Sequence, residues 1–250
     1  MTVRFILMPG LGADRDLFYP QLETLGDSLR VIDTVDDASL WRQPPSMSLA
    51  AETLLRQIRP LIPTDGNYIL GGMSFGGSLA IEMLRQLQKD DAYPRPCKIA
   101  LIASNRTSDS ISKSFRINRA CGSLLPGFLI RGGLGLASKL FARRERLDTE
   151  QATRLRAMAD RASIEHLLWG AKAIARWQLG DDDIKNLDVP IQQIHGQKDW
   201  VIPICPRHVT HTIADGRHLI TWTHRDVIDE WLGGEQKQLD RDSQVDGPDQ

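Results

Sequence analysis

The chain has 250 residues, a formal net charge of -1 at pH 7, 41% hydrophobic residues and 25% charged residues. This length is sufficient for one α/β domain, or for one domain that carries an inserted cap. The composition is ordinary for a soluble globular protein, and the near-zero charge gives no global signal for binding nucleic acid.

Signals for export, for a membrane span and for metal binding do not appear in the sequence. The stretch MTVRFILMPG lacks a basic region followed by a long apolar segment, and its apolar run is too short to cross a bilayer. Cys97, Cys121 and Cys205 lie far apart, with no CxxC or Cys/His ligand spacing. We therefore expect a cytoplasmic protein with no membrane span, no disulfide framework and no structural zinc site.

The N-terminal residues alternate between short apolar runs and amphipathic helical patterns, which is typical of βαβ units around a parallel sheet. Residues 3–10 have the pattern of a buried strand that ends in a Pro-Gly turn. Residues 14–26 predict a helix that Asp14 can cap. The next expected strand covers residues 29–36, and a loop follows over 36–46.

The alternation continues to residue 104. Residues 47–59 carry apolar side chains at helical spacing, with Ser46 or Ser48 as the cap. The elements that follow are a strand, a helix and another strand, at residues 68–74, 76–88 and 97–104. These patterns predict an α/β fold.

The strand signal stops between residues 105 and 180, where the sequence is rich in arginine and helix-like, with Gly and Pro breaks in its first half. Strands resume at residues 189–196 and 208–216, and a last helix covers 218–232. The remaining residues, 233–250, lack apolar periodicity and are expected to be disordered.

The domain organisation follows from this change of pattern. We expect an α/β core made of residues 1–104 and 181–232, with a mostly parallel sheet of about six strands flanked by helices. Residues 105–180 are expected to form a helical cap that is inserted after the fourth strand.

A GxSxG pattern, Gly72 to Gly76, lies where an expected strand meets an expected helix. The pattern alone is weak evidence, but a strand before it and a helix after it place the hydroxyl of Ser74 above the sheet edge on a strained backbone. The two glycines remove side chains that would collide where strand and helix cross. Ser74 is therefore the candidate nucleophile, and the alternative is a small residue in a tight turn.

Backbone N–H groups near Ser74 are candidates for stabilising an oxyanion. The helix that begins after Ser74 has free N–H groups and a positive dipole end. We expect one donor to be the N–H of Phe75 and the second to be the N–H of Leu11, in the glycine-rich turn after the first strand.

A serine nucleophile needs a base to accept its proton and a carboxylate to orient that base. His218 follows the last expected strand, at the carboxyl edge where catalytic groups gather in such sheets, and Asp199 lies in a loop at the same edge. The predicted triad is therefore Ser74, Asp199 and His218. Alternatives for the base and the acid are His195, His224, Asp188 and Asp215.

Four motifs together resemble those of the α/β-hydrolase superfamily, in its small esterase, lipase and acyl-transfer branch: LMPGLGAD, GGMSFGG, IHGQKDWVIP and DGRHLI. They span about residues 5–220, and residues 105–180 match the position of the family's variable cap. The resemblance implies the same triad and the same two oxyanion donors. The chain departs from the family in having Pro9-Gly10 where a His-Gly pair is common, and in beginning at the family's third strand.

The expected cap has two features that bear on the substrate. It contains fourteen Lys or Arg residues and six Asp or Glu residues, which can attract an anionic substrate such as an acyl carrier or a coenzyme A ester, or can be solvated helix faces. Its apolar part is more typical of a helix that closes a pocket than of a membrane-surface helix. Trp41, Trp169 and Trp177 are candidate pocket residues, with ordinary core packing as the alternative.

These residues predict a serine hydrolase that cleaves a carboxylic ester or thioester of a small-molecule acyl substrate, without a cofactor or metal, through an acyl-enzyme that water resolves. Acyl transfer, perhydrolysis or carbon–carbon cleavage by the same triad is the first alternative. A non-catalytic binding or accessory protein of the same fold is the second. The identity of the acyl group and the oligomeric state stay open.

Overall fold

Six parallel strands form the centre of the protein. The computed structural model describes residues 3–33, 38–90, 92–108 and 127–234. The strands are β1 (Phe5–Met8), β2 (Leu29–Val31), β3 (Ile69–Met73), β4 (Lys98–Ile102), β5 (Ile191–Gly196) and β6 (His211–Ile213). They form one sheet in the order β2-β1-β3-β4-β5-β6, and all five neighbouring pairs are parallel. The six expected strands and the parallel sheet are therefore confirmed.

Apart from Lys98 at the start of β4, the central strands β1, β3 and β4 are apolar because both faces of the sheet are covered. In β1, alternate side chains enter two different cores: Ile6 and Met8 belong to one, and Phe5 and Leu7 to the other. All four are fully buried.

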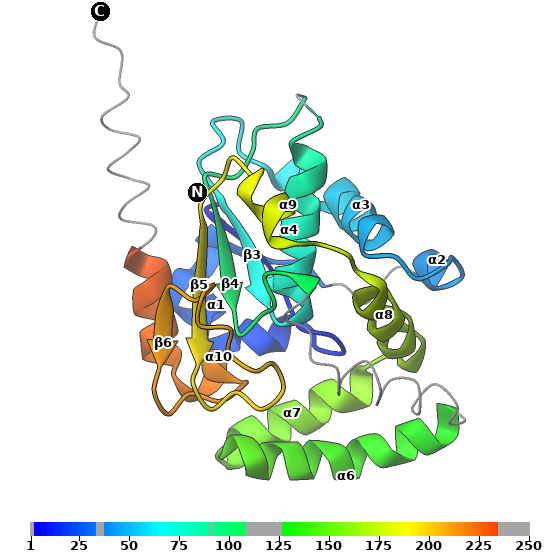
Figure 1. The fold of residues 1–250 in the computed structure, drawn as a ribbon. Coiled ribbons are helices and arrows are strands. Elements are labelled where there is room, and N and C mark those ends of the chain that lie inside the picture. Colours follow the sequence, from blue (N-terminus) through cyan, green and yellow to red (C-terminus); the bar gives the residue numbers. More distant parts are fainter. Residues whose placement is uncertain (1–2, 34–37, 91, 109–126, 235–250) are drawn as a thin grey trace, which may run out of the picture.

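Helices cover both faces of the sheet (Figure 1). The core that contains Ile6 lies under α3 (Met47–Ile58) and α4 (Phe75–Leu87). The opposite core lies under α1 (Tyr19–Leu25), α10 (Ile220–Thr223) and a helix over residues 225–234. Three short 3-10 helices complete this part of the chain, at Arg15–Phe18, Gly26–Ser28 and Arg59–Leu61.

The structure corrects several predicted helix caps and helix boundaries. Ser46, and not Ser48, caps α3, because its side chain accepts a hydrogen bond from the N–H of Leu49. Asp14 caps the 3-10 helix that precedes α1, where it accepts from the N–H of Asp16. A short helix, α2 (Ala38–Trp41), forms inside the segment expected to be a loop. The last helix is also divided, because the helical pattern is interrupted at residue 224.

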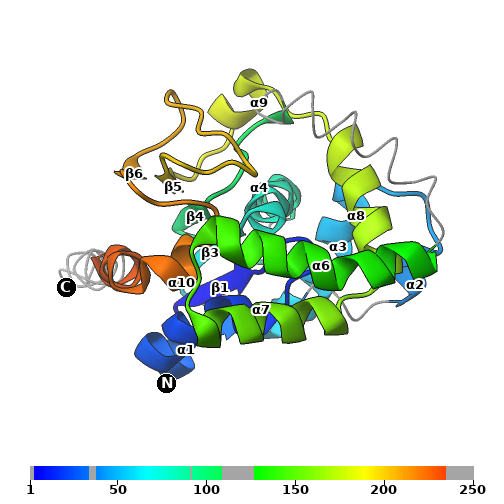
Figure 2. The same ribbon diagram turned by 90° about the horizontal axis from the view of Figure 1, so that it is seen from below.

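Between β4 and β5, the described part of the chain contains three long helices: α6 (Gly127–Glu145), α7 (Thr149–Arg161) and α8 (Ile164–Arg176). We call them the α6–α8 layer. The carboxyl ends of the strands point toward this layer, and α6 and α7 lie side by side across them (Figures 1 and 2). The layer therefore covers the edge where Ser74, Asp199 and His218 are expected to meet.

The layer continues into a short helix, α9 (Asp181–Lys185), before β5. Within the expected cap, residues 109–126 lie outside the described residues, and so do residues 235–250 of the expected tail. The division of the chain into a core and a cap stays a prediction. None of the helices in the described part of the chain is both long and apolar enough to cross a membrane.

Candidate active site

Ser74 lies in the sharp turn that joins β3 to α4. Its backbone has φ 57° and ψ -122°, and a non-glycine residue at positive φ costs roughly 1–3 kcal/mol. Two hydrogen bonds to the neighbouring β4 strand and its end hold this conformation. The N–H of Ser74 donates to the carbonyl of Ile102 at 2.9 Å, and the carbonyl of Ser74 accepts from Oγ of Ser104 at 2.6 Å.

The glycines on either side of Ser74 allow α4 to approach the sheet closely. A Cβ on Gly72 would lie 2.5 Å from the carbonyl oxygen of Met8, and a Cβ on Gly76 would lie 2.2 Å from the same oxygen. Real Cβ atoms do not make such contacts. Glycine is therefore required at both positions for the turn that carries Ser74 to pack against β1.

The glycine-rich turn after β1 lies directly against Ser74. Gly10 and Ala13 close this turn through a 3.0 Å backbone hydrogen bond, and Gly12 takes the positive φ of 77° that such a turn demands. A Cβ on Gly10 would lie 3.8 Å from Oγ of Ser74. The structure therefore brings Leu11, which lies inside this turn, to the same site as Ser74.

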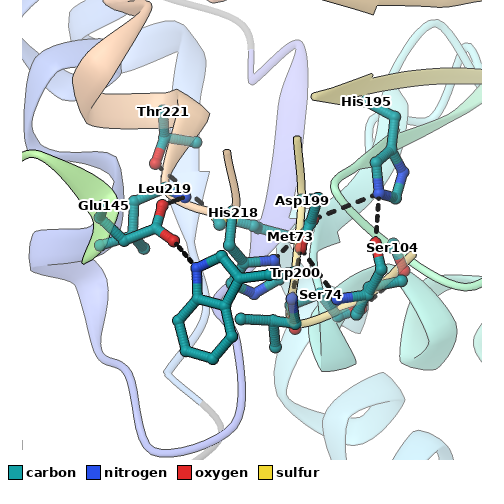
Figure 3. Close-up of polar contacts among 12 residues, drawn as sticks. Met73, Ser74, Ser104, Glu145, His195, Asp199, Trp200, His218, Leu219 and Thr221 are labelled. Carbon is teal, nitrogen blue, oxygen red and sulfur yellow. Dashed lines mark hydrogen bonds and ion pairs between the residues drawn. The ribbon is translucent and has the colours of Figure 1, made fainter. Parts of the chain in front are cut away.

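Asp199 and His218 form a buried hydrogen-bonded pair (Figure 3). Nδ1 of His218 lies 2.8 Å from Oδ2 of Asp199. The other carboxylate oxygen accepts from the backbone N–H groups of Val201 and Ile202, each at 2.8 Å. Because an ionised carboxylate only accepts, the contact assigns a proton to Nδ1 of His218, and in the neutral imidazole Nε2 then has the lone pair that a general base needs.

The environment of Asp199 favours its ionised form. Burial by itself raises the pKa of this carboxyl group, but the charge of His218 and hydrogen bonds from His195, His218 and the Ile202 N–H outweigh that effect. The pKa of Asp199 is therefore held well below its usual range. The group can stabilise a positively charged imidazole at neutral pH.

His195, which the sequence offers only as an alternative base, lies behind Asp199. Its Nε2 is 3.2 Å from Oδ2 of Asp199 and 2.9 Å from the carbonyl oxygen of Ile202. On the other side of the ring, Nε2 of Gln193 lies 3.3 Å from Nδ1 of His195 and donates to the carbonyl of Ser104 at 3.0 Å. His195 is fully buried in this network. Its spacing of four residues before Asp199, at a strand end, is the signal that could have revealed the contact.

His224, Asp215 and Asp188 lie apart from the Asp199–His218 pair. His224 contacts Asp215, an exposed residue, at 3.2 Å. Asp188 pairs with Arg95 at the surface, at 3.2 Å. His224 does not line the cavity at the serine, and Asp215 and Asp188 pair with His224 and Arg95 and not with His218.

The loops that carry Asp199 and His218 are packed backbone against backbone. A Cβ on Gly196 would lie 2.4 Å from the carbonyl carbon of Gly216. The N–H of Lys198 also donates to the carbonyl of Gly216 at 2.9 Å. These contacts hold the two loops in a single arrangement.

A cavity of about 380 Å³ opens at Ser74, and His218, Leu11 and Phe75 line it as well. Most of its wall is apolar. The α6–α8 layer supplies much of that wall, through Leu134, Ala137, Phe141, Leu155, Met158 and Leu167. The structure thus brings together five predicted residues, with Asp199 directly behind His218.

The three tryptophans predicted for the pocket do not lie on this cavity. The indole N–H of Trp169 donates to the carbonyl of Gln43, and the indole N–H of Trp177 donates to Glu82. Trp41 stacks on His166 with ring centroids 5.9 Å apart. All three pack in or against the core beside α3 and α4, because their side chains point to the interior and not to the strand ends.

Several arginines of the α6–α8 layer are already paired with carboxylates. Arg154 binds Glu150 and Arg156 binds Asp160, one helical turn away in each case. Arg161 binds both Asp14 and Asp16. These pairs neutralise part of the basic charge that the sequence shows in this segment.

A metal site is not visible in the described part of the chain, where no group of three or more His, Cys, Asp or Glu side chains could hold an ion. Cys97 and Cys205 are free thiols. Cys121 lies outside the described residues.

A parallel six-stranded sheet flanked by helices, with a strained serine at the β3–α4 turn, defines the α/β-hydrolase fold, and solved structures of that fold match this chain. A thermophilic esterase from Thermogutta terrifontis has a TM-score of 0.74 at 20% identity, over 96% of this chain and 91% of its own. The bromoperoxidase of Bacillus anthracis has a TM-score of 0.71 at 15% identity, over 92% of this chain and 91% of its own.

A thioesterase of the same fold also matches. RedJ, from the prodiginine biosynthetic pathway of Streptomyces coelicolor, has a TM-score of 0.60 at 19% identity, over 93% of this chain and 86% of its own. Comparison of the sequence with family models and with curated proteins gives no match. At these identities the similarities establish the fold, and the expected α/β-hydrolase fold is confirmed.

Proposed function

We propose that this protein is a serine hydrolase of carboxylic esters or thioesters. The observation that carries the proposal is that Ser74 and His218 line one apolar cavity, with Nδ1 of His218 bound to Asp199. This arrangement supports Ser74 as the nucleophile, His218 as the base and Asp199 as the group that orients the base.

In the proposed reaction, Nε2 of His218 accepts the hydroxyl proton as Oγ of Ser74 attacks the substrate carbonyl. The N–H groups of Phe75 and Leu11 stabilise the oxyanion that forms. His218 then donates the proton to the leaving alcohol or thiol, and an acyl-enzyme remains. Water, activated by the same imidazole, attacks the acyl-enzyme and releases the acid.

The wall of the cavity supports an apolar acyl group as the part of the substrate that binds there. Apolar side chains of the α6–α8 layer and of the loops make up most of its surface, and burial of a hydrocarbon chain against them is favourable at roughly 0.8 kcal/mol per CH₂ group. The esterases and the thioesterase among the structures of the same fold act at ester and thioester bonds according to their names, which is consistent with this substrate class.

A fluorophosphonate probe tests the nucleophile directly. We expect the probe to label Ser74 in the folded protein, with intact-mass and peptide analysis locating the adduct, and Ser74→Ala to remain unlabelled. Ser78→Ala is a matched control, because Ser78 is buried next to the turn and its hydroxyl already donates to the carbonyl of Asn105. Absence of labelling at Ser74 in folded protein would contradict the covalent mechanism.

Turnover of p-nitrophenyl esters and acyl thioesters of graded chain length tests the reaction. We expect a burst of p-nitrophenol followed by steady release, with the free acid as the product in water. Labelling of Ser74 without release of product from any of these substrates would instead favour acyl transfer to another acceptor or a binding role.

A further inference from the structure

Glu145 is a buried glutamate in the α6–α8 layer. It is the last residue of α6, and 1% of its surface is exposed. Among the described residues, no Lys or Arg forms an ion pair with it, although Arg143, Arg144 and Arg146 surround it in the sequence. Its carboxyl group therefore depends on neutral hydrogen-bond donors.

Those donors come from the two loops of the candidate site (Figure 3). Oε1 of Glu145 accepts from the indole N–H of Trp200 at 2.5 Å, and Oε2 accepts from the backbone N–H of Leu219 at 2.8 Å. Trp200 directly follows Asp199, and Leu219 directly follows His218. One carboxyl group thus joins α6 to the loop of the acid and to the loop of the base.

The position of Glu145 is not explained by the stability of α6. The carboxyl end of a helix is the negative end of its dipole, which favours Lys or Arg and disfavours a carboxylate. Removing a carboxyl group from water is also costly unless hydrogen bonds replace the lost hydration. A residue that contradicts local preference in this way is typical of a functional site.

Further contacts from α6 hold the indole of Trp200. The ring of Phe141 packs against it with centroids 5.1 Å apart, and the guanidinium of Arg144 lies over it at 4.0 Å from the centroid. Trp200 is therefore held by Phe141 and Arg144 at its ring and by Glu145 at its N–H. Movement of α6 away from the sheet would release the residue next to Asp199.

We propose that Glu145 is a positioning residue, which couples the seating of α6 to the alignment of Asp199 with His218. The proposal rests on the proposed function, since it assigns Glu145 a role in that same site. Glu145 does not contact the substrate carbonyl. It acts through the backbone that carries the acid and the base, and a displacement of about 1 Å at such a pair can lower a rate by about 10²-fold.

Three substitutions remove the hydrogen bonds of Glu145 to different extents. Glu145→Gln keeps one acceptor oxygen for two donors, and Glu145→Ala removes both acceptors. Trp200→Phe removes only the indole donor while it keeps an aromatic ring against Phe141. Glu150→Gln is a matched control, because Glu150 is exposed on α7 and pairs with Arg154 at the surface.

For p-nitrophenyl ester hydrolysis we expect Glu145→Ala to lower kcat by about 10²-fold with KM changed less than about threefold, and Glu145→Gln to be intermediate. The rate of fluorophosphonate labelling of Ser74 should fall in parallel. Trp200→Phe should cost little once Glu145 is Ala, because coupled residues are not additive. Glu150→Gln should match the wild type.

Hydrogen exchange gives a readout that does not depend on turnover. We expect the backbone N–H of Leu219 and the indole N–H of Trp200 to exchange at least tenfold faster in Glu145→Ala, with thermal unfolding measured on the same samples to confirm that the variant is folded. If the wild type hydrolyses esters and folded Glu145→Ala keeps the same kcat, the positioning role is wrong while the proposed function stands.

If the wild type neither hydrolyses esters nor takes the probe, the proposed function is wrong, and hydrogen exchange alone decides the coupling. Faster exchange in both loops then supports the link between α6 and the Asp199–His218 pair. Unchanged exchange in both loops overturns it.

Discussion

His195 and Asp199 lie 3.2 Å apart, Nε2 to Oδ2, with the histidine fully buried behind the carboxylate. Oδ2 thus contacts two imidazoles, one on each side, because His218 approaches the same oxygen at 2.8 Å. Backbone N–H groups occupy Oδ1. Both carboxylate oxygens of Asp199 are thus held by contacts with other residues.

His195→Phe should therefore lower catalysis without removing a catalytic group. Phe has a similar ring but no nitrogen, so Asp199 loses one donor and can turn away from His218. We expect kcat for ester hydrolysis to fall by about 10- to 10²-fold, with little change in KM, in a steady-state assay. His211→Phe, at an exposed position on β6, is the control. Wild-type kcat in folded His195→Phe would mean that the remaining bonds suffice.

Asp199→Asn should have a larger effect. An amide at this position can donate to Nδ1 of His218, which favours the wrong tautomer and leaves Nε2 without a lone pair. We expect kcat to fall by about 10³- to 10⁴-fold while an apolar substrate analogue still binds. Stopped-flow kinetics and isothermal titration calorimetry measure the two quantities. A loss below about tenfold would indicate that another carboxylate orients the base.

Burial of His166 should make stability depend on pH in the acid range. Desolvation lowers the pKa of His166 to about 4 from 6.5, so the unfolded chain binds a proton that the folded chain does not. The contribution of His166 to the free energy of unfolding is complete at pH values above its pKa in the unfolded chain. It is lost as the pH falls toward the pKa of His166 in the folded protein. Between pH 7.5 and pH 5 the free energy of unfolding should fall by about 2 kcal/mol from this group.

His166→Phe should remove that component, because Phe can keep the stack on Trp41 and does not titrate. Urea unfolding of the wild type and the variant at both pH values measures the difference. An equal pH dependence in the two proteins would show that folding does not change the pKa of His166.

The crossing of α4 over β1 should not tolerate a side chain at Gly76. A Cβ there would lie 2.2 Å from the carbonyl of Met8 and 2.5 Å from that of Pro9, and backbone atoms cannot yield without moving the turn of Ser74. We expect Gly76→Ala to destabilise the protein by at least about 3 kcal/mol in urea unfolding.

Gly133→Ala is the matched change in α6, where a Cβ would meet no atom within 4 Å. It should be neutral or stabilise the protein by up to about 1 kcal/mol, because alanine has the higher helix propensity. Equal effects of the two substitutions would contradict the close crossing at Gly76.

The wall supplied by α6 should limit the length of the acyl chain. Ala137 lines the cavity, so Ala137→Phe would fill part of its volume. With p-nitrophenyl esters of graded length, we expect kcat/KM for long chains to fall by about 10-fold or more and that for acetate to change little. Ala157→Phe, at an exposed position on α7 that does not line the cavity, should leave the profile unchanged. A uniform loss for all chain lengths would place the acyl group elsewhere.

The sequence determined the order of the secondary structure and the turn around Ser74. Apolar runs such as residues 5–8 and 99–102 become buried parallel strands because both faces of the sheet are covered, so local hydrophobicity alone marks them. The GxSxG spacing identifies Ser74 because Gly72 and Gly76 leave room for the close contact between α4 and the neighbouring strand β1. Asp199 and His218 could be selected because the carboxyl ends of parallel strands meet at one edge.

The contacts of side chains from separate segments were decided only by the tertiary structure. Trp41, Trp169 and Trp177 looked like pocket residues, but the direction in which a helix presents its side chains depends on how it docks, and these three point into or against the core. Glu145 gave no signal of its contact with Leu219. Their hydrogen bond joins residues 74 positions apart, so no local sequence pattern predicts it. The bond exists only when α6 packs against the sheet.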